Sequence, residues 1–468
     1  MSFGGKGVPA GHVVRTFRAK VMATPGQRRR CLELLEGAGD AWAFCIDRFH
    51  ERRRNGLGNA NSLGQLWPDQ KAHGPFGELS AHCAQDVTKA WSAAFFESMR
   101  RRSAGQKARL PLRKRHRVPV TWRKGEFYFP PRRQGGRPRV VLLTRRGSAN
   151  VELRLSHDDP YDQQGIRAVR LVEEAGALFV DLTAFVAVVP AALDEAQAAG
   201  VDVGIIHPLA LAYRDRALVV SGRALRAEEF LHLADTKDRQ RRQSTKRAPV
   251  RAGPGKPRQS GSLRWRRLAA GQRRHEARNR RVLKAGVYRA ARLASTFVVD
   301  EARAKEVAVG DPRGVKDRHA GAVHNRRTHR WALSFTLHTL GDRLEERGVR
   351  VVLLDERGTS SVCPLCGSRA IKAGRLLKCT NPPCGKVHHR DVAGAQNVLG
   401  RFGHAPKAIA HLEHRRVGSP PRRDRRRHLH DHLRSETRGP VGPARTRATS
   451  TAASVVEESL VSVARTPS

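Results

Sequence analysis

Four clustered cysteines constrain this chain more than any other feature of its sequence. They are spaced as Cys363-x2-Cys366, twelve residues, and then Cys379-x4-Cys384. Two such pairs joined by a short hairpin supply the four thiolates that a tetrahedral structural zinc site prefers, and a closed set of four leaves no position for catalysis. The alternative is four unrelated buried cysteines. The pairing favours zinc, although the second pair has four intervening residues where two are usual.

The remaining cysteines and the apolar segments indicate where the protein works. The other cysteines are scattered through helical-looking sequence and are interpreted as small buried hydrophobic residues: Cys31, Cys45 and Cys83. Clustering of the other four favours metal over disulfides in a reducing compartment. The opening MSFGGKGVPAGHVV lacks the apolar region of a secretory signal, and Asp181 and Pro190 interrupt the most apolar stretch, 178–193. We therefore expect a cytoplasmic protein with no membrane partner.

The charge of the chain predicts a polyanionic partner. The chain has 468 residues, enough for roughly three domains, and a formal net charge of +46. Such an excess is far larger than solubility requires, and it favours nucleic acid as the partner. We therefore expect the protein to associate with the nucleoid.

The first half of the chain predicts a mixture of strands and helices. Residues 13–21 alternate like a strand, and apolar residues at helical spacing predict helices over 27–54 and 79–102. From Leu110 onward, prolines, aromatics and basic residues alternate in a way that favours short strands. The runs on either side of Ala175-Gly176 predict a β-hairpin.

The second half predicts strands that end in acidic residues. Residues 200–222 contain a buried strand that carries Asp202 and two further short strands. Another buried strand lies in 305–315, an amphipathic helix in 331–348 and a further strand in 349–355, which ends at Asp355. Strands, a helix and a strand, with acids at the strand ends, are typical of an α/β nuclease core.

Two basic regions flank that pattern. Between Arg239 and Val299 the only acidic residue is Glu276, so this tract is either a disordered arm or a solvated helix along a polyanion. Residues 246–262 look like a linker, whereas 283–297 keep helical spacing and have a face to bury. The tail after Gly400 is polar and rich in proline and arginine, which favours disorder.

A further acid, Asp391, stands at the start of an apolar-periodic helix within HHRDVAGAQNVLGR, residues 388–401. Taken alone, this position favours an ordinary helix N-cap, a role in which aspartate is common.

Taken together, these pieces resemble the TnpB family of transposon-encoded RNA-guided nucleases, relatives of the type V CRISPR effectors. The resemblance runs from FRAKVMATPGQ through VDVGI, VAVGD and DERGTSSVCPLCG to HHRDVAGAQN, about residues 10 to 401, and is most specific in 358–397. It implies a wedge β-barrel (10–26 and 108–195) with a helical recognition insertion (27–107). It further implies a RuvC or RNase H-like nuclease (196–359 and 388–401) with a basic helical insert (226–299), a zinc ribbon (360–387) and a basic tail (402–468).

The resemblance also implies a catalytic site of carboxylates around divalent metals, here magnesium. Asp202 matches the first acid of the family and Asp391 the last, but Gly310 stands where the middle glutamate belongs. Glu356, in the DxR step where most relatives have no acid, is expected to replace it. Alternatively, Glu356 forms a surface salt bridge with an arginine. Asp311 and Asp355 are lesser candidates for the third ligand.

Three functions remain open at this point. The first is an RNA-guided, magnesium-dependent DNA endonuclease of a mobile element, with guide RNA and double-stranded target DNA as partners. The second is a catalytically inactive RNA-guided DNA-binding protein, and the third is an unguided zinc-ribbon nucleic-acid-binding protein. In each case, the residues expected to contact nucleic acid are arginines of the basic insert: Arg264, Arg266, Arg267, Arg273, Arg274, Arg280 and Arg281.

Overall fold

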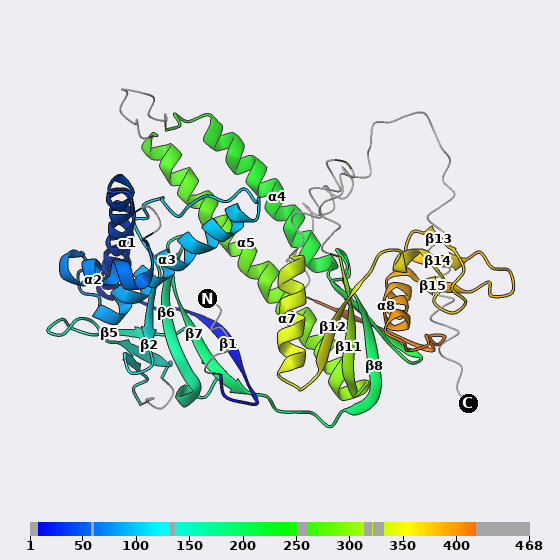
Figure 1. Ribbon diagram of the computed structural model, residues 1–468. Coiled ribbons are helices and arrows are strands. Elements are labelled where there is room, and N and C mark those ends of the chain that lie inside the picture. Colours follow the sequence, from blue (N-terminus) through cyan, green and yellow to red (C-terminus); the bar gives the residue numbers. More distant parts are fainter. Residues whose placement is uncertain are drawn as a thin grey trace. The chain divides into compact units, whose positions relative to one another are not determined.

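The chain is a mixed α/β protein of several domains, as the sequence predicts. The computed structural model describes residues 8–57, 60–131, 136–158, 160–249, 261–312, 321 and 332–417. They divide into two compact units, one ending at Ala187 and the other beginning at Val188 (Figure 1). This division falls before the 195/196 boundary expected from the sequence.

The first unit contains two antiparallel sheets. The larger has the strand order β1-β7-β6-β2 and the smaller the order β3-β4-β5. Their bounds are β1 (His12–Lys20), β2 (Val120–Arg123), β3 (Phe127–Tyr128), β4 (Arg139–Leu142), β5 (Val151–Arg154), β6 (Ile166–Glu174) and β7 (Ala177–Ala187). The predicted hairpin at Ala175-Gly176 is confirmed: both residues have positive φ, 52° and 86°, as the tight turn between β6 and β7 requires.

Helices α1 (Pro25–Arg54) and α3 (Ala81–Ser103) pack against these sheets, and α2 (Leu63–His73) packs against α1 and α3. The helices predicted at 27–54 and 79–102 are confirmed, and Thr24 with Gln27 forms a capping box at the start of α1. Helix α2 was not predicted, although Ser62 and Gln65 form the same kind of box. The helices and both sheets share one hydrophobic core. The assignment of this unit to a wedge barrel with a recognition insertion stays a prediction.

The second unit is built on a six-stranded sheet with the order β12-β11-β8-β9-β10-β16. The strands β8, β11 and β12 are parallel, β9 is antiparallel to β8 and β10, and β16 is parallel to β10. Their bounds are β8 (Asp194–Asp202), β9 (Leu209–Tyr213), β10 (Arg216–Ser221), β11 (Ala304–Asp311), β12 (Arg350–Asp355) and β16 (His411–Arg416).

Helices cover both faces of this sheet (Figure 1). They are α5 (Leu263–Thr296) with its π-helical continuation η2 (Phe297–Glu301), α7 (Leu333–Glu345) and, on the other face, α8 (Arg390–Arg401), while α4 (Arg223–Ser244) packs along α5. Val201 and Val309 belong to the core that α5, η2 and α7 complete, whereas Gly200 faces α8 so closely that an added Cβ would lie 2.1 Å from the Ala395 carbonyl oxygen. Because side chains alternate along a strand, Asp202 and Gly310 also face α8.

A small three-stranded sheet is inserted between β12 and α8. It has the order β13-β14-β15, with β13 (Ala370–Ala373), β14 (Leu376–Cys379) and β15 (Val387–His389), and a short helix, η4 (Thr359–Ser361), precedes it. The backbone of Arg390, the first residue of α8, donates to the carbonyl of Arg375 in the turn between β13 and β14. This turn is therefore tied directly to the start of α8.

The expectation of disorder after Gly400 is wrong for residues 402–417. Strand β16 pairs with the outer edge of β10 from Arg216–His411 to Ser221–Arg416, and Val417 beyond it is buried. Backbone pairing of an edge strand needs no apolar pattern, which explains why the polar sequence HLEHRR gave no signal. The rest of the tail and residues 250–260 of the predicted linker lie outside the described residues.

Candidate metal centres and nucleic-acid interface

The clustered cysteines converge on one point of the small sheet. The Sγ atoms of Cys366 and Cys379 are 3.4 Å apart, those of Cys363 and Cys384 are 3.8 Å apart, and all four thiols lie within 4.8 Å of one another. Hydrogen bonding by Ser368 lowers the pKa of the Cys366 thiol to about 6, whereas burial raises the pKa of the Cys363 thiol and raises that of Cys379 to about 12. This cluster could bind zinc as a zinc ribbon does.

Asp202 lies at the carboxyl end of β8, against the second turn of α8. A Cβ added to Gly394 would be 3.0 Å from Asp202 Cγ and 3.1 Å from its Oδ1, so a larger residue at this position would force the carboxylate to shift by a few tenths of an ångström. Burial raises the pKa of Asp202 well above its usual value, and the nearby carboxylates of Asp391 and Glu356 raise it further. Three acids from separate elements therefore share one electrostatic environment.

Glu356 covers Gly310 on the face of the sheet that meets α8. A Cβ added to Gly310 would lie 3.2 Å from both Cβ and Oε2 of Glu356, and 3.3 Å from Cγ2 of Val398. Val309 pairs with Val201 in the parallel register, so the next residues along, Gly310 and Asp202, lie beside each other. Glu356 thus places its carboxylate in the space beside Asp202 that a side chain at 310 would enter.

The two other acids near Gly310, Asp311 and Asp355, point to the opposite face of the sheet from Glu356. Gly310 pairs with Leu354 and Asp311 pairs with Asp355. By strand alternation, Gly310, Leu354 and Glu356 share the face toward α8, whereas Asp311 and Asp355 point to the other face. The exposed Asp355 accepts a hydrogen bond from the backbone of Arg357 at 3.0 Å, a local turn contact. Burial, followed by repulsion from Asp311 and Asp355, raises the pKa of Glu356 to about 7.

Asp391 is not the N-cap of α8, because His389 occupies that position and Asp391 lies within the first helical turn. Its carboxylate is buried, with Oδ2 3.0 Å from Arg375 Nη1 and Oδ1 3.5 Å from Arg390 Nε. The N-cap interpretation is therefore corrected. Asp391 is held by the turn of the small sheet as well as by its own helix.

Two histidines that the sequence did not single out also approach Asp391. His207, from the loop after β8, has its Nε2 4.0 Å from Asp391 Oδ2, and the His207 and His389 ring centroids are 5.8 Å apart. Their ligand atoms and that of Asp391 lie within 4.8 Å of one another, a set that could hold a metal ion. Burial lowers the pKa of both histidines to about 4, against the attraction of Asp391, so both are neutral near pH 7. The one signal in the sequence for this group was His389, which lies two residues before Asp391 in HHRD.

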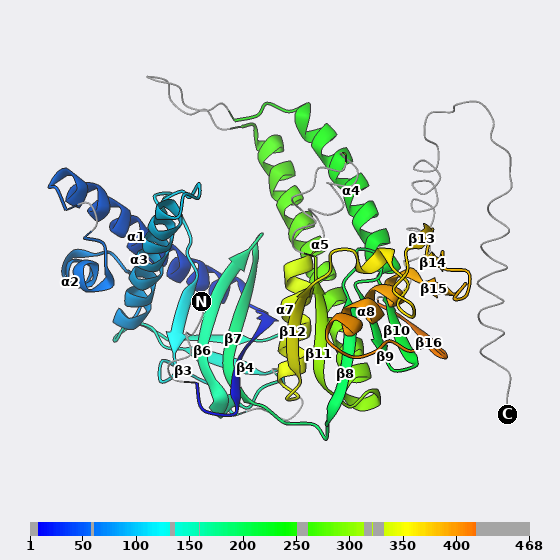
Figure 2. The same ribbon diagram turned by 45° about the vertical axis from the view of Figure 1, so that its right-hand side comes forward.

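The arginines expected to contact nucleic acid all lie on α5. Helices α4 and α5 run alongside each other as an antiparallel pair (Figure 2). The arginines are exposed along the part of α5 that ends at Arg281: Arg264, Arg266, Arg267, Arg273, Arg274, Arg280 and Arg281. Their role stays a prediction. Across the described ranges, no helix is long and apolar enough to span a membrane.

Comparisons with known proteins agree with this architecture. Residues 337–398, from α7 through the small sheet into α8, match the family model described as Cas12f1-like, TNB domain. The match supports a TnpB-like or type V effector-like protein. A Cas12f1–sgRNA–target DNA complex superimposes with a TM-score of 0.56 at 12% identity, covering 83% of this chain and 99% of that chain. The fold is therefore similar to that of Cas12f1.

A second solved structure, the mini-RNA-guided endonuclease CRISPR-Cas_phi3, gives a TM-score of 0.48 at 8% identity, covering 88% of this chain and 94% of that chain. No curated protein matches the sequence significantly.

Proposed function

We propose that this protein is an RNA-guided, divalent-metal-dependent DNA endonuclease associated with a mobile element. The observation that carries the proposal is the packing of Glu356 over Gly310, next to Asp202. Position 310 lacks the acid expected there, and Glu356, which follows the adjacent strand β12, packs into the space that this acid would occupy. A surface glutamate that merely pairs with an arginine has no reason to lie there.

The chemical type of the three carboxylates suits the metals that such a reaction needs. Asp202, Glu356 and Asp391 offer hard oxygen ligands, the type that magnesium prefers. Divalent ions held there would activate a water and stabilise the leaving oxygen of a phosphodiester. Burial, and after it the proximity of Asp391 and Glu356, raises the pKa of Asp202, and a bound cation would relieve this repulsion between the acids.

The other residues of the site have supporting roles in this proposal. Gly394 and Gly200 allow α8 to approach β8 closely, which sets the position of Asp391 relative to Asp202. The four thiols would hold a structural zinc, and the turn bearing Arg375 would transmit that order to the start of α8. The net charge of +46 and the exposed arginines of α5 would hold the phosphates of a guide RNA and its target duplex.

Cleavage of a guide-matched duplex tests the proposal. RNA that co-purifies with the protein is sequenced, and a duplex complementary to its variable part is incubated with the complex in magnesium. Glu356→Gln, Asp202→Asn and Asp391→Asn should each remove most cleavage, because an amide is a poor ligand for a hard dication. Binding of the same duplex, measured in parallel, should stay near the wild-type value.

Asp355→Asn is the matched control, since Asp355 is adjacent in sequence but points to the other face of the sheet; it should cost far less cleavage. Tight guided binding by a wild-type protein that does not cut would indicate an inactive RNA-guided DNA-binding protein. Recovery of only random RNA fragments would refute guidance altogether.

A further inference from the structure

Two histidines and Asp391 converge where β15 meets α8. His207 comes from the loop between β8 and β9, His389 ends β15, and Asp391 lies in the first turn of α8. One ligand atom from each side chain lies within 4.8 Å of the other two, and His207 Nε2 is 4.0 Å from Asp391 Oδ2. His207 is 4% exposed and Asp391 is 8% exposed. Three ligand groups from separate segments therefore meet at a buried place.

Hydrogen bonding does not account for the two imidazoles. Nδ1 of His207 and Nδ1 of His389 are buried and have no hydrogen-bond partner within the described part of the chain. The 4.0 Å between His207 Nε2 and Asp391 Oδ2 is also too long for a hydrogen bond. A buried polar group without a partner is destabilising, and a bound ion is one of the reasons why such a group persists.

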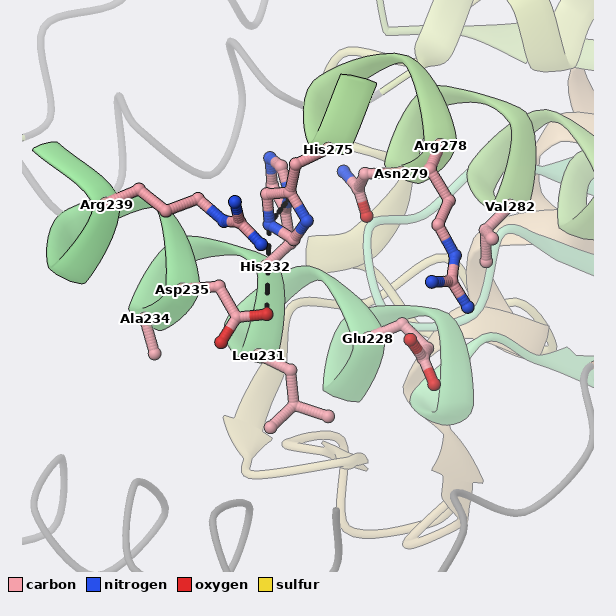
Figure 3. Close-up of a pocket in the computed structure, with 10 residues that line it drawn as sticks. All are labelled: Glu228, Leu231, His232, Ala234, Asp235, Arg239, His275, Arg278, Asn279 and Val282. Atoms are coloured by element: carbon pink, nitrogen blue, oxygen red, sulfur yellow. Dashed lines mark hydrogen bonds and ion pairs between the residues drawn. The ribbon is translucent and has the colours of Figure 1, made fainter. Parts of the chain in front are cut away.

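A second pair of histidines, between α4 and α5, shows the ordinary alternative. They line a pocket of about 280 Å³, and Figure 3 shows the rings of His232 and His275 together. His232 Nδ1 lies 2.8 Å from His275 Nε2, and the rings stack with centroids 4.4 Å apart. These two imidazoles satisfy each other by a hydrogen bond. The ring centroids of His207 and His389 are 5.8 Å apart, so their arrangement around Asp391 has a different basis.

Asp391 keeps coordination capacity beside its two arginines. Its Oδ2 lies 3.0 Å from Arg375 Nη1, and its Oδ1 lies 3.5 Å from Arg390 Nε. An ionised carboxylate offers about four acceptor positions, so these contacts leave some of them for an ion. Hydrogen bonds to a ligating carboxylate are usual in metal sites, where they orient it. The positive guanidinium groups oppose a bound cation, but the nearby carboxylates of Asp202 and Glu356 offset this opposition.

We propose that His207, His389 and Asp391 hold one transition-metal dication, such as zinc, in preference to magnesium. Imidazole nitrogens suit zinc and related ions, whereas magnesium takes oxygen ligands. In a tetrahedral zinc site with bonds of about 2.0–2.2 Å, ligand atoms lie about 3.3 Å apart, so each of the three atoms would move inward by less than about 1 Å. Three protein ligands leave the fourth position of such a site for water or substrate.

This site deepens the proposed function. Asp391 is one of the three acids assigned to the catalytic metals, and among the described residues Asp202 and Glu356 are not part of its group with the histidines. One metal of the nuclease would therefore have two nitrogen ligands, and the other would have the oxygens of Asp202 and Glu356. The role of the ion in cleavage rests on the proposed function, whereas its binding can be measured in a protein that does not cut.

Metal analysis tests the site without reference to cleavage. Full-length protein is dialysed against micromolar free zinc with millimolar magnesium present, and zinc per chain is measured. Wild type should hold one zinc more than His207→Gln or His389→Gln, whose affinity at this site should fall by at least about 100-fold because glutamine lacks the imidazole nitrogen. His275→Gln, a change in the hydrogen-bonded pair between α4 and α5, is the matched control and should keep the wild-type content.

Cobalt identifies the ligands. Wild type that keeps its ribbon zinc is titrated with cobalt, and the spectrum should show weak visible bands without thiolate charge transfer, because this site has no sulfur ligand. Both glutamine variants should lack these bands while they keep the ribbon zinc, which shows that they are folded. If a variant also loses the ribbon zinc, the zinc content and cobalt bands of the wild type decide alone.

Two results would overturn the proposal: a wild type that holds only the ribbon zinc and gives no cobalt bands, or equal zinc in wild type and both glutamine variants. Cleavage in magnesium separates these results from a failure of the proposed function. A wild type that cuts without the second ion supports the function and refutes the site. A wild type that binds the ion and does not cut supports the site and refutes the function.

Discussion

Replacement of Gly310 by alanine tests whether Glu356 really occupies the space above it. The new Cβ would lie 3.2 Å from Glu356 Cβ and Oε2 and 3.3 Å from Val398 Cγ2, whereas ordinary contacts begin at 3.4 Å. The Glu356 carboxylate can swing away, but its Cβ is fixed by the backbone, so the strands must shift. Overpacking of this kind lowers the free energy of unfolding by roughly 1–3 kcal/mol.

The same substitution in a Glu356→Gly background should cost less, since only the Val398 contact remains. We expect the penalty to fall by about 1 kcal/mol, a coupling within the range found for residues in contact. Urea unfolding of the four proteins measures it, because any backbone effect of glycine at 356 appears in both arms of the cycle and cancels. An equal penalty in both backgrounds would refute the packing.

DNA cleavage tests the contact between positions 310 and 356 in a second way. Gly310→Glu in the Glu356→Gly background should regain part of the cleavage that Glu356→Gly alone loses, because the side chain at 310 starts beside Asp202. Gly310→Glu in the wild-type background should not help, since two side chains would compete for one space.

Three further predictions address other parts of the molecule. Cys363→Ser should lose the ribbon zinc and loosen the adjoining sheet and α8, because structural metal binding is linked to local folding; metal analysis decides, with buried Cys31→Ala as the control that keeps its zinc. In metal-free protein, the free energy of unfolding should fall as pH rises from about 4.5 to about 7, because the raised pKa of Glu356 means that the folded state favours its protonated form and loses this advantage as the carboxyl ionises. Glu356→Gln should flatten this part of a curve of unfolding free energy against pH. Neutralising four arginines of α5, Arg273, Arg274, Arg280 and Arg281, should weaken nucleic-acid binding at any sequence and reduce the dependence of the binding constant on salt. An unchanged salt dependence would mean that this face is only solvated.

Much of the fold could be predicted from local sequence. The long helices of the first unit follow from apolar residues at helical spacing, and the hairpin at Ala175-Gly176 follows from the two strand-like runs that flank it. The cysteine spacing alone brought four thiols together, because a short hairpin leaves them little choice of position. In each case residues close in the chain carry the whole signal.

Strand register decides which acid shares a face of the sheet with Gly310. The sequence offered Asp311, Asp355 and Glu356, and nothing in its spacing showed which of them faces Gly310. The parallel pairing of Gly310 with Leu354 settles the faces, since alternation then puts Glu356 on one side and the two aspartates on the other. Register is set by contacts between distant segments, so no local pattern contains it.

Only the tertiary structure produced the remaining groupings. His207 meets Asp391 through the approach of α8 to β8, and His232 meets His275 through the pairing of α4 with α5. Polar β16 joins the sheet through backbone hydrogen bonds, which do not depend on the identity of its side chains. The sequence by itself determined most of the elements and the cluster of four thiols, because those depend on neighbours along the chain. The tertiary structure decided which polar side chains meet, because that depends on how the elements pack.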